Sequence, residues 1–169
     1  HAAFININRP ELMCRSFSSE NDLINVLSLA TTVVFGVGLG KSKWSEALFQ
    51  SFLSTKVLVP KLIDADGLNW IASTKHYEEN WILTPHPGEA ARLLEKSIEW
   101  VQANRALAAE TIHKQYGGVC VLKGRNTLVC GESTSLCSLG NPGMATAGTG
   151  DVLSGVIGGL LAQGLSNEV

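Results

Sequence analysis

Several features that assign a protein to a common functional class are absent from this 169-residue sequence. Its formal net charge is only −2 and it has no run of basic residues, so we expect no nucleic-acid-binding groove. No uninterrupted apolar stretch is long enough to cross a bilayer, and there is no signal peptide. The sequence also has no internal repeat and no low-complexity linker. These absences favour one globular domain that works in the cytoplasm without binding a membrane or nucleic acid.

Cysteine is sparse, and its spacing is not that of a metal site. No C-x-x-C pair occurs among the four cysteines, which are Cys14, Cys120, Cys130 and Cys137. Cys120 lies in an apolar run, and Cys130 ends another. This pattern favours buried, reduced thiols in a reducing compartment over a zinc site or disulfides.

The ends of the sequence are abrupt. It begins at His1 without an initiator methionine, and it stops at Val169 just after a helix-like segment. We therefore expect residues 1–169 to be one partial domain of a longer polypeptide.

Short β-rich runs alternate with longer segments of helical periodicity. The patterns predict strands at 32–35, 61–64, 81–83 and 119–123, a hairpin from 127–130 and 136–139, and helices at 45–54, 68–73, 89–95, 98–115 and 152–163. The last helix is apolar almost all round, so we expect it to be buried. The alternation predicts an α/β fold: an open, mainly parallel sheet with helices on both faces.

Chemically distinctive segments follow four of the predicted strands. They are Gly36–Gly40, Asp64–Asn69, Thr84–Glu89 and Lys123–Gly124. Because open α/β sheets bind ligands at the carboxyl ends of their strands, this placement predicts a ligand site at that edge.

The most informative segment runs from Asn141 to Asp151 and leads into the last predicted helix. Glycine and threonine at a helix N-terminus present backbone amides, and the helix dipole adds partial positive charge there. Together they suit a phosphate group or a phosphoryl group in transfer. The simpler interpretation is that Asp151 is an N-cap or a first-turn acid, but Gly143, Gly148 and Gly150 just ahead favour function. The segment is not a Walker A loop, since no Lys-Ser/Thr pair follows its glycines.

The other segments each permit two interpretations. Lys123 at a strand end can reach a nucleotide phosphate or simply be solvated. His86 lies between two prolines, which suits either rigid presentation to a ligand or a structural turn. Asp64 and Asp66 can hold Mg²⁺ or cap the following helix.

Taken together, these segments resemble the NAD(P)H-hydrate dehydratase family, whose fold is ribokinase-like. The matching blocks are Gly36-Val-Gly-Leu-Gly40, Asp64-Ala-Asp-Gly-Leu-Asn69, Leu83–Leu94, Val121–Gly124 and Asn141–Gly155. The sequence departs from the usual family pattern in three places: Val37 replaces a proline, Arg125 and Asn126 precede the matching Thr127, and Ala147 stands where glycine is frequent.

The resemblance implies a set of roles. Asp151 would act as the catalytic base, and Gly38, His86 and Asp151 would face the hydrate. The residues that would face the adenine nucleotide are Lys123, Gly124, Arg125, Asn126, Thr127 and Gly150. The resemblance further implies Mg²⁺, ADP or ATP as co-substrate with ADP favoured, a homo-oligomer, and a fused or partner NAD(P)HX epimerase domain.

The implied reaction repairs a nicotinamide ring that has been hydrated across a double bond. Hydroxide is a poor leaving group, so phosphorylation of the ring hydroxyl makes dehydration feasible, and loss of phosphate restores NADH or NADPH. Two alternatives remain at this point: a vitamin or sugar kinase of the same fold, and a nucleotide-binding remnant without activity.

Overall fold

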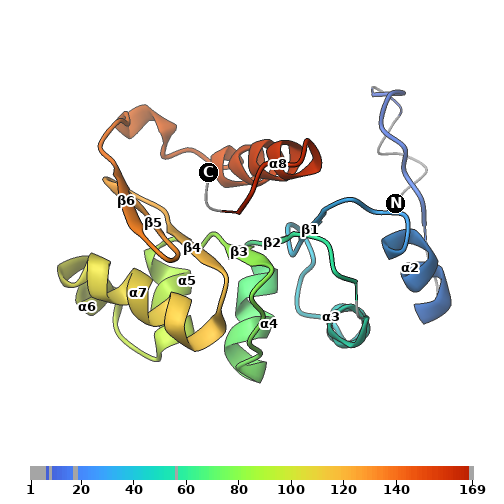
Figure 1. The fold of residues 1–169 in the computed structure, drawn as a ribbon, viewed down its shortest axis with the longest axis horizontal. Helices are drawn as coiled ribbons and strands as arrows, with labels where there is room; N and C mark the ends of the chain where they lie inside the picture. The colour runs from blue at the N-terminus through green and yellow to red at the C-terminus, as the bar shows by residue number, and fades with distance from the viewer. Residues whose placement is uncertain (1–6, 8, 17–18, 56, 168–169) are drawn as a thin grey trace.

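The computed structural model describes residues 7, 9–16, 19–55 and 57–167, which contain one mixed six-stranded sheet in the order β1-β2-β3-β4-β5-β6 (Figure 1). The strands are β1 (Val33–Phe35), β2 (Lys61–Ile63), β3 (Trp81–Leu83), β4 (Val119–Leu122), β5 (Thr127–Cys130) and β6 (Thr134–Cys137). Strands β1 to β4 are parallel to one another, and β4, β5 and β6 are antiparallel. The prediction of a mainly parallel α/β sheet is confirmed.

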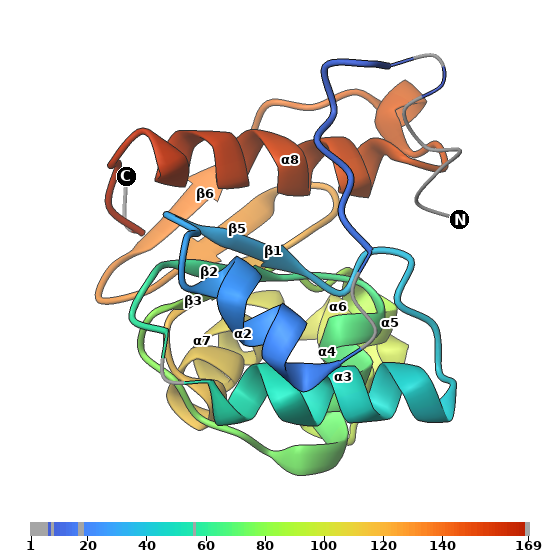
Figure 2. The same cartoon turned by 90° about the vertical axis from the view of Figure 1, so that its right-hand side faces the viewer.

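The helices form a thick layer on one face of the sheet and a thin layer on the other. Their bounds are α2 (Glu20–Leu27), α3 (Lys43–Ser54), α4 (Asp66–Thr74), α5 (Pro87–Leu94), α6 (Ile98–Ala103), α7 (Arg105–Tyr116), the 3₁₀ turn η1 (Pro142–Met144) and α8 (Thr149–Ala162). Among the helices of the described residues, α2 to α7 lie on one side of the sheet and α8 crosses the other side (Figures 1 and 2). This is the three-layer arrangement that the sequence predicted.

The main core lies between the sheet and the thick helical layer. Trp81, Tyr116, Phe49 and Phe52 are at most 2% exposed there. The indole of Trp81 donates to the backbone oxygen of Tyr116 at 2.9 Å, and the Tyr116 hydroxyl donates to the backbone oxygen of Leu93 at 2.7 Å. Burial of these rings stabilises the fold, and the hydrogen bonds remove the cost of burying their polar atoms.

The predicted helix at 98–115 is two helices, α6 and α7, which meet at Asn104. The Asn104 backbone has a φ of −129° and a ψ of 42°, outside the helical region. Its side-chain amide donates to the backbone oxygen of Trp100 at 2.9 Å and so ends α6. The prediction of one continuous helix was wrong because the apolar spacing continues through the break. Helix α2 was not predicted, and β6 begins two residues earlier than expected.

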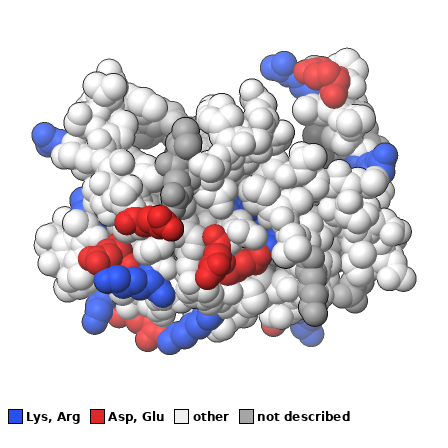
Figure 3. Space-filling view, in the orientation of Figure 1, with Lys and Arg blue, Asp and Glu red and all other residues white. Residues whose placement is uncertain are grey.

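Helix α8 is not buried, which corrects the expectation from its composition. Ser154, Gly158 and Leu161 face the sheet, whereas Val152, Val156 and Leu160 are 67%, 54% and 42% exposed. Gly158 lets the helix approach β1, because a Cβ there would lie 2.5 Å from Val34 Cγ2. The surface over α8 is almost free of charge (Figure 3). The apolar composition therefore does not reflect burial on all sides: one face of α8 packs on the sheet, and its outer face is apolar and exposed.

The cysteines are free thiols with different environments. Cys120 and Cys130 are buried and lie opposite each other on β4 and β5, as the sequence led us to expect. Cys14 is partly exposed and Cys137 is exposed, so the expectation of burial was wrong for Cys137. The reason is that β6 is exposed along its whole length.

None of the helices in the described ranges combines the length and the apolar character needed to cross a membrane.

Candidate active site

The carboxyl ends of the parallel strands bring four predicted segments to one edge of the sheet. Asp64 follows β2 and Lys123 follows β4, and the Lys123 ammonium donates to Asp64 Oδ1 at 2.7 Å. Ser154 of α8 donates its hydroxyl to Asp64 Oδ2 at 2.6 Å. Asp64, Lys123 and α8 thus meet although up to 90 residues separate them.

Asp64 is a buried, ionised carboxylate. It is 1% exposed, and burial alone would raise its pKa, but the hydrogen bonds from Lys123 and Ser154 outweigh burial and hold the pKa below its ordinary value. The Ala65 amide also donates to Oδ1 at 2.8 Å. Both carboxylate oxygens are therefore engaged by protein groups, which argues against Asp64 as a direct ligand of Mg²⁺.

The glycine-rich turn after β1 is tightly built around Asp64. A Cβ on Gly36 would lie 2.1 Å from the Asp64 backbone oxygen, and φ is +113° there, so only glycine fits. Gly40 donates its amide to Asp66 Oδ2 at 2.9 Å, which gives Asp66 a role in shaping this turn. Gly38 is exposed and faces open space, with no atom within 4 Å of where a Cβ would be. That space is available for a ligand.

The Thr84–Glu89 segment connects β3 to α5, and His86 is the N-cap of α5. His86 Nδ1 accepts from the Gly88 amide at 3.0 Å, and Glu89 Oε2 accepts from the His86 amide at 2.8 Å, which completes a capping box. Burial, followed by the charges of Lys123 and Arg92, lowers the His86 pKa. The imidazole is therefore neutral near pH 7. Because Nδ1 accepts a hydrogen bond, the ring proton belongs on Nε2.

His86 serves the structural turn and still presents part of its ring outward. Its side chain is 52% exposed, and Nε2 lies 3.3 Å from Glu89 Oε1. Glu89 is 7% exposed, and burial raises the pKa of its carboxyl. The two interpretations of this segment, a rigid turn and a ligand-facing histidine, are thus compatible with one geometry.

The segment from Lys123 to Thr127 forms the tight turn between β4 and β5. Gly124 and Asn126 have positive φ, and Thr127 donates its hydroxyl to the Gly124 backbone oxygen at 2.9 Å. Arg125 is exposed. Five of the six residues predicted to face a nucleotide therefore lie together in this turn, and the sixth, Gly150, lies in α8.

Arg105 stabilises this turn, a role that the sequence patterns did not predict. Its Nη2 atom donates to the backbone oxygens of Leu122, Lys123 and Asn126 at 3.0, 3.3 and 3.3 Å. It also explains Gly124, where a Cβ would lie 3.3 Å from Arg105 Nη1. No local signal identifies Arg105, because it begins a helix 17 residues before the first carbonyl that it binds.

The amino end of α8 brings the glycine-rich segment to the same place. Gly148 is the N-cap, with a φ of +88° and no side-chain cap, and Asp151 is an exposed acid in the first turn. A Cβ on Gly150 would lie 3.5 Å from Lys123 Nζ and 3.9 Å from Asp64 Oδ2. The first-turn amides of α8, which lack acceptors within the helix, therefore lie beside the Lys123 ammonium.

Metal-binding side chains are not grouped in the described part of the chain: no set of three His, Cys, Asp or Glu residues is placed to hold an ion. Mg²⁺ commonly uses one or two carboxylates together with substrate phosphates. The donor set therefore fits an ion carried by a nucleotide better than a resident metal.

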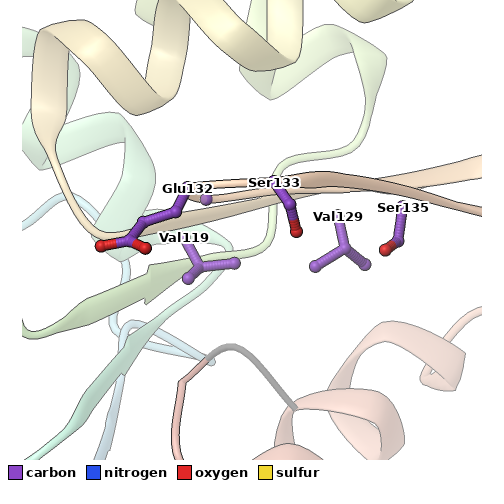
Figure 4. Close-up of a pocket in the computed structure, with 6 residues that line it drawn as sticks. Val119, Val129, Glu132, Ser133 and Ser135 are labelled. Carbon is purple, nitrogen blue, oxygen red and sulfur yellow. The ribbon is translucent and has the colours of Figure 1, made fainter.

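A shallow hollow elsewhere on the sheet is not part of this edge. It is lined by Val119, Val129, Gly131, Glu132, Ser133 and Ser135 (Figure 4). Val119 begins β4, whereas Lys123 follows the end of that strand, so the hollow lies toward the opposite edge.

The fold and this edge of the sheet define a ribokinase-like protein. A ribokinase-like superfamily protein from Enterococcus faecalis superposes with a TM-score of 0.83 at 28% identity, over 94% of this chain and 56% of that chain. The ADP/ATP-dependent NAD(P)H-hydrate dehydratase from Bacillus subtilis, co-crystallized with ATP/Mg²⁺ and soaked with CoA, superposes with a TM-score of 0.68 at 31% identity, over 78% of this chain and 48% of that chain.

The sequence comparisons give the family. The NAD(P)H-hydrate dehydratase family model matches residues 1–168, so the chain belongs to that family. A bifunctional NAD(P)H-hydrate repair enzyme from Coxiella burnetii is 50% identical over 168 residues, which are 98% of this chain and 34% of the relative. The chain thus spans about a third of that relative's length.

Proposed function

We propose that the protein containing this chain converts NAD(P)H hydrate back to NAD(P)H at the expense of ADP or ATP. One observation carries the proposal: Lys123, Asp64 and the first turn of α8 converge at the carboxyl edge of the sheet. An ammonium beside helix-end amides stabilises a phosphoryl group in transfer. Membership of the dehydratase family supports NAD(P)H hydrate as the substrate.

The proposed reaction has two steps. The terminal phosphoryl group moves to the ring hydroxyl oxygen while Asp151 accepts the hydroxyl proton. The lone pair on the ring nitrogen then expels phosphate, and loss of a proton from the neighbouring ring carbon restores the double bond. Gly38 and His86 would face the hydrate, while Gly150 and the turn from Lys123 to Thr127 would face the nucleotide.

Mg²⁺ fits this scheme as an ion bound by the nucleotide phosphates, whose charge it would neutralise. The Bacillus subtilis relative is an ADP/ATP-dependent enzyme that was co-crystallized with ATP and Mg²⁺. We propose the same pair of donors for this protein, with ADP preferred.

The setting of the reaction is also proposed. The free thiols suit a reducing cytoplasm. The bifunctional relative supports a fused NAD(P)HX epimerase domain in the longer protein, and the uncovered outer face of α8 is compatible with a homo-oligomer.

The test follows both products in one reaction. Full-length protein is incubated with NADH hydrate, ADP and Mg²⁺, and the absorbance of reduced nicotinamide is recorded together with free phosphate. We expect the two to appear in equal amounts. A stable phosphorylated product would instead identify a small-molecule kinase, and nucleotide binding without turnover would identify a remnant.

A further inference from the structure

The structure assigns Asp64 as a positioning residue that fixes Lys123 against the first turn of α8, so that nucleotide phosphates meet a preset ammonium. The inference rests on the proposed nucleotide site. It goes beyond the interpretations that the sequence offered for Asp64, which were a magnesium ligand and a helix cap.

The Asp64 backbone is held by two neighbouring elements. Its amide donates to the Phe35 oxygen at 3.0 Å, and its own oxygen accepts from the Gly67 amide at 3.0 Å. The carboxylate therefore projects from a fixed point between β1 and α4. A rigid anchor of this kind is what a long, flexible lysine side chain needs in order to keep one position.

The carboxylate joins two parts of the site that are distant in sequence. Oδ1 accepts from Lys123 after β4, and Oδ2 accepts from Ser154 in the second turn of α8. Ser154 is itself 1% exposed, so this contact is shielded from water. One side chain thus sets the separation between the ammonium and the helix end, where Gly150 leaves room for close approach.

Asp64 acts through these partners and does not touch the phosphates. It is 1% exposed, both of its oxygens are engaged, and its negative charge would repel a phosphate. Without it, the nearest alternative carboxylate for Lys123 is Glu89, whose Oε2 lies 3.9 Å from the ammonium. Loss of the Asp64 charge would therefore draw Lys123 toward α5 and away from α8.

The experiment measures how strongly the phosphates contribute to binding. The Kd values of ADP and of adenosine are determined for full-length wild-type protein, Asp64→Asn, Lys123→Met and the double variant. Charged hydrogen bonds of this kind correspond to about 10- to 100-fold in affinity. We expect either single change to weaken ADP binding by about that factor while adenosine binding changes little. Because Asp64 acts through Lys123, the double variant should be no weaker than Lys123→Met alone.

Two further variants separate positioning from folding. Ser154→Ala removes one hydrogen bond but keeps the Asp64 charge, so it should weaken ADP binding by only a few-fold. Glu110→Gln is the acid-to-amide control: Glu110 pairs with Lys114 on the exposed surface of α7, away from Lys123, so the ratio of ADP to adenosine affinity should be unchanged. If Asp64→Asn does not fold, the Ser154→Ala result decides.

The outcomes are distinct. Equal weakening of ADP and adenosine by Asp64→Asn or Ser154→Ala, or additive effects in the double variant, would overturn the positioning role and leave the proposed function intact. A wild-type protein that binds ADP no better than adenosine would overturn the nucleotide site, and the inference with it.

Discussion

Asp64 and Asp151 are carboxylates at the same edge of the sheet, and their surroundings give them different chemistry. Asp64 is buried and both of its oxygens accept hydrogen bonds from protein groups, so its carboxylate is not presented to a substrate. Asp151 is exposed in the first turn of α8, and the N-cap is Gly148. Of these two carboxylates, Asp151 is the exposed one, and we propose that it accepts the proton from a bound molecule.

Asp151→Asn tests that role in the full-length protein. The change keeps the size and most of the hydrogen bonding but removes the basicity, so we expect turnover to fall by about 10²–10⁴-fold. Nucleotide affinity should stay near the wild-type value because the helix-end amides remain. The melting temperature should change little, since Asp151 is not the cap. The measurements are steady-state rate, nucleotide Kd and thermal unfolding; near-normal turnover would remove Asp151 from the mechanism.

For His86, the capping and ligand-facing roles are separable with two substitutions. His86→Ala removes both the ring and the N-cap acceptor, and the lost cap costs about 1 kcal/mol. His86→Asn keeps a cap acceptor but removes the imidazole. We expect both variants to weaken hydrate binding more than nucleotide binding, as measured by titration of each ligand. If Asn restores hydrate affinity, His86 is only a cap.

At the level of elements, the turn between β4 and β5 depends on a helix that precedes it in sequence. A single nitrogen atom of Arg105, at the start of α7, donates to the backbone oxygen of Leu122 at the end of β4 and to those of Lys123 and Asn126 in the turn. Gly124 and Asn126 have the positive φ angles of a tight reversal between the two strands. The predicted nucleotide turn is therefore ordered before any ligand arrives, which reduces the entropy lost on binding.

Arg105→Lys should loosen this turn. A lysine ammonium cannot reproduce the planar guanidinium across three carbonyls, so we expect nucleotide affinity to fall by about tenfold and the free energy of unfolding by about 1–3 kcal/mol. Arg92→Lys is the matched control, because Arg92 binds the Asn69 side chain and lies outside the turn. Equal nucleotide Kd values for the two variants would contradict the role of Arg105.

The elements also show what the sequence could predict. Apolar runs located β1 to β5, because each strand is defined by its own buried residues. The carboxyl-edge rule predicted that Asp64 and Lys123 lie close together, and their side chains are 2.7 Å apart. Gly150 was assigned to the same site only through the resemblance to the family. The binding of three backbone oxygens by Arg105 and the exposure of α8 depend instead on which elements pack together in the folded chain. No local pattern contains that information.

Across the whole molecule, the two faces of the sheet are unequally covered. Helices α2 to α7 bury one face, while α8 alone covers part of the other and turns Val152, Val156 and Leu160 outward (Figure 2). The chain spans only 56% and 48% of the two solved relatives described above. We therefore expect further protein surface to lie against α8 in the longer protein.

This expectation gives a test of residues 1–169 alone. We predict that they turn over NADH hydrate at least tenfold more slowly than the full-length protein, because an uncovered α8 would hold the proposed base, Asp151, less rigidly. Parallel rate measurements at equal concentration, with circular dichroism to check that the shorter chain is folded, decide the matter. Equal rates would show that the described residues suffice.

The mixed sheet has one more consequence, for how this family can vary. The loops after β1, β2 and β3 each lead into a helix, so a change in their length must move packed elements. The turn from Lys123 to Thr127 leads instead into β5 and then β6, an outer hairpin whose last strand is exposed. Exposed side chains of that turn, such as Arg125, can change while the four parallel strands keep their register. We therefore expect donor preference to change through this turn without a change in the packed elements of the sheet.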